Sequence, residues 1–176
     1  MGAIEFHGYF RLEGRPDSQI DVVAELALKL KELLEKKDLQ REIEQAHIFG
    51  ASSHKIQEAI TPSVLTLGFT SEKKGLFADI KVPGIRPDFY KPIKSGGIIL
   101  EVERGKTIAN NMDLLDVWKT HICQSANHLF LLVPQIRVTQ TGAKQKIYST
   151  VVNRVGAFFE ENTDPIDIDS VHIFGY

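Results

Sequence analysis

Apolar and polar residues follow two different periods along this chain, and together the periods predict an α/β protein. Between residues 20 and 37, apolar side chains recur every three or four positions, which is the spacing of an amphipathic helix. Charged residues occupy the other side of that helix and are expected to face solvent. The same spacing predicts further helices at about 54–69, 108–126 and 148–161.

Local signals mark the ends of the first two helices. Asp17 or Ser18 is expected to cap the first helix, because a side-chain oxygen can accept a hydrogen bond from a free backbone N–H group. Ser52 or Ser53 can cap the second helix in the same way. Pro62 lies inside the second pattern and is expected to interrupt or end that helix.

Short apolar runs predict strands. The run "IILEVE", residues 98–103, follows a Gly-Gly break, and "HLFLLVP", residues 128–134, ends at a proline. Because a helix lies between these two strands, they are expected to be parallel and joined by a right-handed crossover. Short strands are also expected at 4–12 and 170–176, strands with turns at 72–93, and a polar loop at 140–145. This order of elements predicts the α/β class, with a central mixed β-sheet flanked by helices.

The composition narrows the domain organisation. The chain has 176 residues, 43% of them hydrophobic and 25% charged, which fits one folded domain with a sizeable core. We expect a single domain over residues 1–176, with its core at about 50–135. The helix at 18–37 and the C-terminal helix and strand at 148–176 are expected to pack on that core.

Charge and cysteine content exclude several classes of protein. The net charge of −2 argues against a strongly basic nucleic-acid-binding domain, although a local basic surface could still bind nucleic acid. The one cysteine, Cys123, excludes an internal disulfide and a cysteine-rich zinc site; Cys123 and Trp118 are both expected in the core. No apolar run reaches the ~18–20 residues of a membrane span, and no signal peptide is evident, so we expect a cytoplasmic protein.

Three carboxylates stand around the strand at 98–103. Glu101 and Glu103 are two residues apart and therefore point to the same face of that strand. Asp88 stands thirteen positions before Glu101, and the connection "YKPIKSGG" can fold it back as a hairpin. Buried carboxylates that converge need a compensating cation, and oxygen ligands without cysteine suit Mg²⁺ or Mn²⁺. Such an ion could polarise a phosphate and activate a water for phosphodiester hydrolysis.

A plainer interpretation of the same residues stays open. Alternating acidic and apolar residues also occur in half-exposed strands, where Arg104 and Lys106 would neutralise the glutamates. Pro87 directly before Asp88 favours a functional site, as does the polar segment after the strand. In that segment Asp116 and Lys119 are three residues apart and can share a helix face. Its members are Arg104, Lys106, Thr107, Asn110, Asn111, Asp113, Asp116, Lys119 and His121.

The segments "RPDFY", residues 86–90, and "LEVER", residues 100–104, resemble the two halves of the motif of the PD-(D/E)XK nuclease superfamily. That superfamily includes many type II restriction enzymes and DNA-repair nucleases, and the resemblance covers about residues 50–135. It implies a restriction-endonuclease-like core in which Asp88, Glu101 and the Val102 backbone carbonyl bind the metal. Many members also carry a glutamate on a helix ahead of the hairpin, and Glu58 in "HKIQEAI" is the matching residue.

The sequence departs from the motif at one position, because Glu103 stands where the family has lysine. Some restriction enzymes also have glutamate there. Lys106 or Lys119 could take over the role of the missing lysine, and we predict Lys119. The predicted catalytic residues are therefore Asp88, Glu101, Glu103 and Lys119, and the predicted metal ligands are Asp88, Glu101, Glu58 and the Val102 carbonyl.

The resemblance implies a Mg²⁺-dependent DNA endonuclease of restriction or repair, with Mn²⁺ able to replace Mg²⁺. It also implies a homodimer, since one active site cuts one strand. The alternatives are a catalytically inactive nuclease-fold module for DNA binding or assembly, and a structural protein whose acids pair with Arg86, Arg104 and Lys106. Cations in predicted loops could line a DNA cleft: Lys73, Lys74, Lys91, Lys94, Arg137, Lys144 and Lys146.

Overall fold

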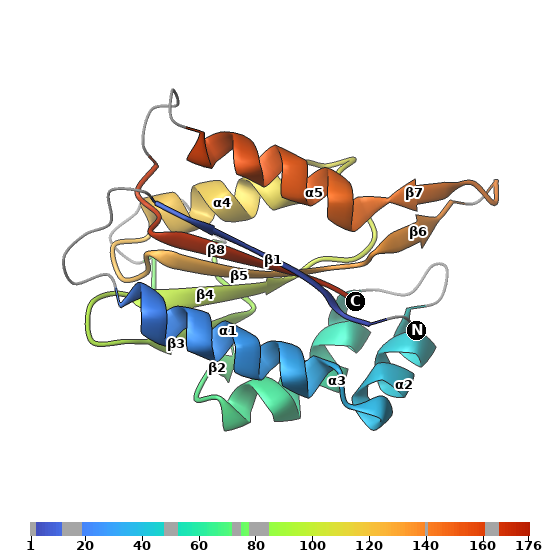
Figure 1. The fold of residues 1–176 in the computed structure, drawn as a ribbon, viewed down its shortest axis with the longest axis horizontal. Coiled ribbons are helices and arrows are strands. Elements are labelled where there is room, and N and C mark those ends of the chain that lie inside the picture. The colour runs from blue at the N-terminus through green and yellow to red at the C-terminus, as the bar shows by residue number, and fades with distance from the viewer. Residues whose placement is uncertain are drawn as a thin grey trace.

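A six-stranded β-sheet forms the centre of the molecule, with helices on both of its faces (Figure 1). The structure is a computed structural model that describes residues 3–11, 19–47, 53–71, 75–77, 85–139, 141–160 and 166–176. The strands of the sheet are β1 (Glu5–Phe10), β2 (Thr70–Ser71), β3 (Phe89–Pro92), β4 (Gly97–Val102), β5 (His128–Val133) and β8 (Ser170–Gly175). Two more strands, β6 (Ile136–Val138) and β7 (Lys144–Lys146), pair with each other outside the sheet.

The helices lie in two layers. One face of the sheet carries α1 (Ile20–Leu34), α2 (Lys37–Ala46) and α3 (Ser53–Thr66). The other face carries α4 (Met112–Ile122) and α5 (Ile147–Gly156), which continues into a short 3₁₀ turn, Ala157–Phe159. Within the described residues no helix is long and apolar enough to cross a membrane.

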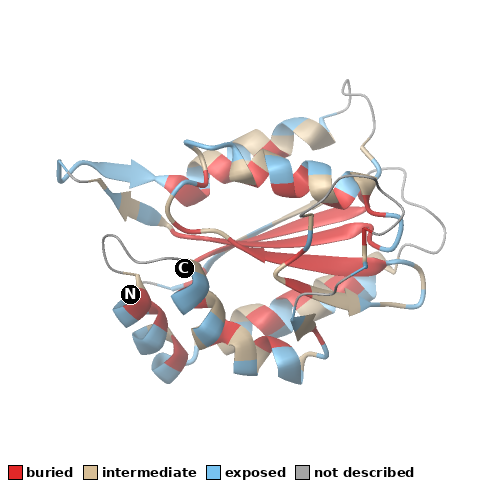
Figure 2. Cartoon of the chain, turned by 180° about the vertical axis from the view of Figure 1, so that it is seen from behind, coloured by how far each residue is buried: buried red, intermediate tan, exposed pale blue. Residues whose placement is uncertain are grey.

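The strand order is β1-β8-β5-β4-β3-β2. The central strands β4, β5 and β8 are parallel, whereas β1, β3 and β2 pair antiparallel to their neighbours. Every residue of the three parallel strands is buried (Figure 2), which explains why their sequences are nearly continuous apolar runs. The predicted α/β fold with a central mixed sheet flanked by helices is confirmed.

The two faces of β4 belong to two separate apolar cores. Ile98, Leu100 and Val102 pack in the core under α1 and α3. Ile99 packs in the other core, with residues of α4 and α5. Because alternate residues point to opposite faces, Glu101 and Glu103 follow Ile99 towards α4.

The helix predicted at 20–37 is α1, which ends three residues earlier at Leu34, and a further helix, α2, begins at Lys37. No helix was expected where α2 lies, yet its residues Leu39, Ile43 and Ala46 are buried at helical spacing. That pattern was available in the sequence, but it is short and stands among charged residues. Its apolar face is defined by packing against α3 and α1.

Pro62 neither interrupts nor ends its helix, because α3 continues through it to Thr66. A proline in a helix removes one hydrogen bond to the carbonyl four residues earlier, here that of Glu58. Both residues are on the exposed side of α3, so water can reach that carbonyl. Ser53 is the first residue of α3, while Ser52 and the predicted caps Asp17 and Ser18 lie outside the described residues.

Helix α4 is shorter than the predicted 108–126, and its residue Trp118 is 45% exposed instead of in the core. Cys123 is buried, as predicted. The polar loop predicted at 140–145 is also wrong in part, because Lys144–Lys146 pair with Ile136–Val138 as a two-stranded ribbon. This ribbon gives little sequence signal, because β7 is polar and exposed at all three positions.

Candidate active site

Strand pairing brings the two acids of the hairpin together. Phe89 at the start of β3 lies opposite Leu100 of β4, so Asp88 stands beside Glu101. The backbone N–H of Asp88 donates to Glu101 Oε2 at 3.2 Å, and the N–H of Val102 donates to Asp88 Oδ2 at 2.9 Å. Each carboxylate thus bonds to the backbone of the other strand at the point where the regular pairing ends.

Helix α4 places a lysine on the opposite side of Glu101. Lys119 Nζ lies 2.6 Å from Glu101 Oε1 and 3.0 Å from Asp116 Oδ1. Glu101 and Asp116 are 3% and 1% exposed, so this ion pair is almost completely removed from solvent. Lys106, the other lysine considered in the sequence, is exposed.

Glu103 follows the end of β4 and is held through its backbone. Its N–H donates to the Leu132 carbonyl of β5 at 2.8 Å, and its carbonyl accepts a hydrogen bond from the Tyr176 hydroxyl at 2.8 Å. Burial raises the pKa of its carboxyl group to about 8, and the charges of Asp116 and Asp88 act in the same direction. Glu103 therefore joins the same electrostatic cluster as Asp88, Glu101 and Asp116.

Crowding and burial shift the pKa values of the whole cluster. Burial raises the pKa of Asp88 and Glu101, and it raises the pKa of Asp116 to about 6. Burial alone would lower the pKa of Lys119, but the Glu101 and Asp116 carboxylates outweigh it and raise that pKa. Lys119 stays charged, and the carboxyl groups are harder to ionise because they are buried; for Glu101, Glu103 and Asp116 the neighbouring carboxylates add to the effect.

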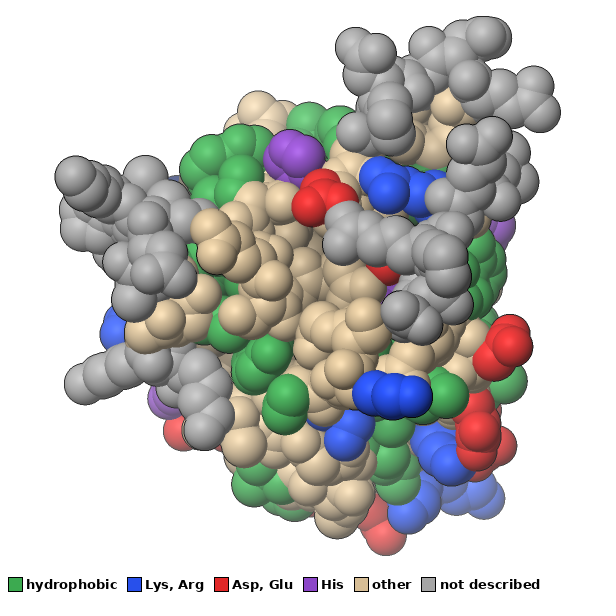
Figure 3. Space-filling view, turned by 90° about the vertical axis from the view of Figure 1, so that its left-hand side faces the viewer, with side chains coloured by type: hydrophobic (Ala, Val, Ile, Leu, Met, Phe, Trp, Pro, Cys, Tyr) green, Lys and Arg blue, Asp and Glu red, His purple; other side chains and the backbone are tan. Residues whose placement is uncertain are grey.

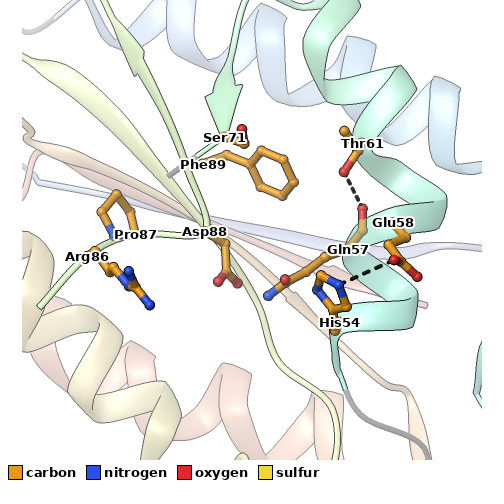
Figure 4. A pocket seen from close by; sticks show the side chains of 9 residues that line it. All are labelled: His54, Gln57, Glu58, Thr61, Ser71, Arg86, Pro87, Asp88 and Phe89. Carbon is orange, nitrogen blue, oxygen red and sulfur yellow. Dashed lines mark hydrogen bonds and ion pairs between the residues drawn. The ribbon is translucent and has the colours of Figure 1, made fainter. Parts of the chain in front are cut away.

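A pocket of about 530 Å³ opens beside Asp88. Its wall on α3 contains Gln57 and Glu58, and Figure 4 shows the Gln57 amide pointing towards Asp88. A hydrogen bond from Gln57 opposes the effect of burial on the Asp88 pKa. The pocket lining is His54, Gln57, Glu58, Thr61, Ser71, Arg86, Pro87, Asp88 and Phe89.

The structure does not bring Glu58 into the buried cluster. Glu58 Oε1 lies 3.3 Å from His54 Nε2, and its side chain is 63% exposed (Figure 4). Gln57, one residue earlier, faces Asp88 instead, and sequence reasoning missed it. Gln57 and Glu58 point in different directions around α3. Choosing between them from the sequence would require knowing which side of α3 faces the β3–β4 hairpin.

Asp88, Glu101 and the Val102 carbonyl, the predicted metal ligands, are oxygen donors of the type that a partly hydrated divalent ion takes. The N–H and C=O groups of a strand residue point to the same side, so the Val102 carbonyl faces the side on which its N–H bonds Asp88. Among the described residues, no three His, Cys, Asp or Glu side chains group as a metal site. Mg²⁺ is commonly held by only one or two carboxylates, with waters and phosphate oxygens completing its shell.

Asp116, which the sequence offered only as a neighbour of Lys119, is part of the site. Its Oδ1 contacts Lys119, while its Oδ2 is buried and accepts no hydrogen bond from the part of the chain that the structure describes. A buried carboxylate oxygen in this state is costly unless something positive lies near it. The cluster thus holds more carboxyl groups than Lys119 can balance when all of them are ionised.

The loop cations separate into two groups. Lys91 and Lys94 lie beyond Asp88 along the β3–β4 hairpin, at its other end, so they do not line a cleft at the acids. Arg137, Lys144 and Lys146 belong to β6 and β7, which follow the end of β5 next to Val102 and Glu103. Lys73 and Lys74 lie outside the described residues.

No family model matches the chain, and no curated protein matches it. A similar solved structure is the restriction endonuclease BglII complexed with a DNA 16-mer, at a TM-score of 0.47 and 12% identity, covering 98% of this chain and 75% of that one. A likeness of this degree does not define a function, so the function has to be inferred from the side chains of this chain.

Proposed function

We propose that this chain is a Mg²⁺-dependent DNA endonuclease with a restriction-endonuclease-like core. The observation that carries the proposal is the position of Lys119, whose Nζ contacts Glu101 beside Asp88. An acid pair with a lysine at its side is what the PD-(D/E)XK motif supplies, although residue 103 is glutamate here. In this chain the lysine comes from helix α4 instead of from the strand.

The chemistry follows from the charges at the site. A divalent ion bound by Asp88, Glu101 and the Val102 carbonyl would polarise the phosphate and lower the pKa of the attacking water. Lys119 holds the Glu101 carboxylate in place, and its permanent charge can offset the negative charge that develops on the phosphate. Glu103, with a pKa of about 8, is placed to orient water and to exchange a proton near neutral pH.

Plasmid nicking and calorimetry with Mg²⁺ test the proposal, with Mn²⁺ as the second metal. Wild-type protein should bind Mg²⁺ and convert supercoiled plasmid to the nicked form. Lys119→Met should abolish nicking, whereas Lys106→Met, the matched control at an exposed lysine, should cut like the wild type. The proposal is wrong if the wild-type protein neither binds Mg²⁺ nor cuts DNA.

A second candidate is a nuclease-fold module that binds DNA or assembles with partners but does not cut. Glu103 at the lysine position favours it, and so does Glu58, whose carboxylate pairs with His54 away from the acid cluster. Mg²⁺ binding without nicking, with both metals, would support this candidate. The homodimer and a cytoplasmic setting are also proposals that follow from the resemblance, and analytical ultracentrifugation tests the first of them.

A further inference from the structure

The β6–β7 ribbon is a basic arm that projects past one end of the sheet (Figure 1). Residues 136–146 contain three cations, Arg137, Lys144 and Lys146, and no acidic residue, in a chain whose net charge is −2. The two strands pair antiparallel, with Ile136 opposite Lys146 and Val138 opposite Lys144. Residues opposite each other share a face, so these four side chains lie together.

The face that carries these four side chains is open to solvent. Ile136 is 45% exposed and Val138 is 50% exposed, and all three residues of β7 are exposed. The surface therefore combines two aliphatic groups with two ammonium groups. A ribbon of only two strands has no core of its own, so an uncovered apolar face on it is available to a partner.

The base of the ribbon is fixed to the body of the protein. Gln135 Nε2 donates to the carbonyls of Ala3, at 2.7 Å, and Gly175, at 3.0 Å. Directly after α2, the ring of His47 contacts the Ile136 carbonyl through Nε2 at 3.2 Å. These contacts hold the ribbon in a set direction relative to the sheet.

The ribbon begins at the same edge of the sheet as the acid cluster. Val102 of β4 pairs with Leu132 of β5, and the chain passes from β5 into β6 directly beyond this point. Arg137 lies on the other face of the ribbon, near Arg104. Burial lowers the pKa of Arg104, and the positive charge of Arg137 lowers it further. Positive charge thus extends from the ribbon to the residue after Glu103. At the opposite end of the molecule, acidic and basic side chains mix (Figure 3).

We propose that the ribbon binds B-form duplex DNA by entering its major groove, which deepens and rests on the proposed nuclease function. The B-DNA major groove, about 12 Å wide, admits a two-stranded β-ribbon. Lys144 and Lys146 would contact phosphates, while Ile136 and Val138 would meet the thymine methyl groups that the groove exposes. The major groove of duplex RNA is too deep and narrow for this contact, and a single strand has no groove.

Fluorescence anisotropy with EDTA present measures binding without cleavage. The probes are a labelled DNA duplex, its single strand and the RNA duplex of the same sequence. Lys144→Gln with Lys146→Gln should weaken DNA-duplex binding at least about tenfold and lower the salt dependence by about two ion equivalents. The control removes the same charge elsewhere, by Lys29→Gln on α1 with Lys94→Gln in the β3–β4 turn, and should bind like the wild type.

The outcomes separate the two proposals. The ribbon proposal is overturned if the Lys144 and Lys146 variant binds duplex DNA like the control, or if the wild type binds single strands or duplex RNA as tightly as duplex DNA. If one of these results is obtained and the wild type still nicks plasmid, the nuclease function is supported and only the ribbon proposal is wrong. If the ribbon variant loses binding but the wild type never cuts with Mg²⁺ or Mn²⁺, the nuclease function fails while duplex binding by the ribbon remains.

Discussion

At the end of the sheet where β4, β5 and β8 begin, buried polar groups satisfy one another. Asn127 Oδ1 accepts a hydrogen bond from the Gly97 N–H, and its Nδ2 donates to Asp169 Oδ2. Asp169 also lies 4.0 Å from Arg11. Next to this group, Ser170 Oγ lies between the rings of His128, at 2.8 Å, and His172, at 3.2 Å.

At the other end of the same strands, buried and half-buried carboxyl groups lie close together. Asp88, Glu101, Glu103 and Asp116 all have raised pKa values, with burial as the largest cause. Lys119 offsets only part of this charge. The first end is therefore organised for stability, because each of these side chains has at least one neutral or oppositely charged partner, although His172 Nδ1 accepts no hydrogen bond from the described residues. The second end stores electrostatic strain that a bound cation would relieve, which is typical of a functional site.

The largest expected contrast is between Asp88→Asn and the wild type in DNA cleavage. Losing one charged ligand should reduce nicking at least about 10²–10³-fold, the loss that accompanies removal of one group stabilising transition-state charge. The free energy of unfolding in EDTA should stay equal or rise, since asparagine still accepts the Val102 N–H and one repelling charge is gone. Urea unfolding checks this, with exposed Asp38→Asn as the control. If Asp88→Asn lowers stability strongly, Asp88 is a structural residue.

Lys119→Met should lower the free energy of unfolding by about 3 kcal/mol at pH 8, because it leaves Glu101 and Asp116 as unpaired buried carboxylates. At pH 5 the cost should be smaller, since the carboxyl groups can take up protons. Urea unfolding at the two pH values measures this difference. Lys106→Met should change stability by less than about 0.5 kcal/mol at either pH, and an equal effect of the two substitutions would contradict the ion pair.

Asn127→Ala removes two side-chain hydrogen bonds at the end of the sheet where β4, β5 and β8 begin. It should lower the free energy of unfolding by about 2 kcal/mol, because the Gly97 N–H and the Asp169 carboxylate lose a buried partner. Calorimetric Mg²⁺ affinity should not change, since Asn127 is at the opposite end of β4 and β5 from Glu101. Asn110→Ala, at an exposed asparagine, is the control and should leave stability unchanged. A loss of Mg²⁺ affinity in Asn127→Ala would show that the two ends are coupled.

The last expected contrast is in how stability in EDTA depends on pH. Glu103 has a pKa of about 8 in the folded protein against 4.5 as its ordinary value, and Asp116 has about 6 against 3.8. Between those values the folded state holds more protons than the unfolded state, so stability should fall as the pH rises from about 5 to about 8. Glu103→Gln should flatten this slope, whereas Glu58→Gln, at an exposed residue, should not. Thermal melts across this pH range compare them.

The sequence alone was enough to locate β4, β5 and the pairing of Asp88 with Glu101. These features depend on local rules, because alternation sets the face of a strand residue and a short hairpin sets its partner. The same local rules failed at α2 and at Pro62, where packing and solvent access decide whether a helix continues. They also failed at β6–β7. These strands do not pack on the core, so their sequences lack the apolar pattern by which a strand is recognised.

Only the tertiary structure decided which groups complete the acid cluster. Lys106 and Lys119 were both candidates in the sequence, with Lys119 predicted, and the docking of α4 on the sheet puts Lys119 against Glu101 while Lys106 stays exposed. The docking of α3 likewise turns Gln57, not Glu58, towards Asp88. The spacing of apolar residues that are close in the sequence determines whether a segment is a helix or a strand and which of its sides is buried. The position of one element on another depends on how two apolar surfaces fit, and residues far apart in the chain set that fit.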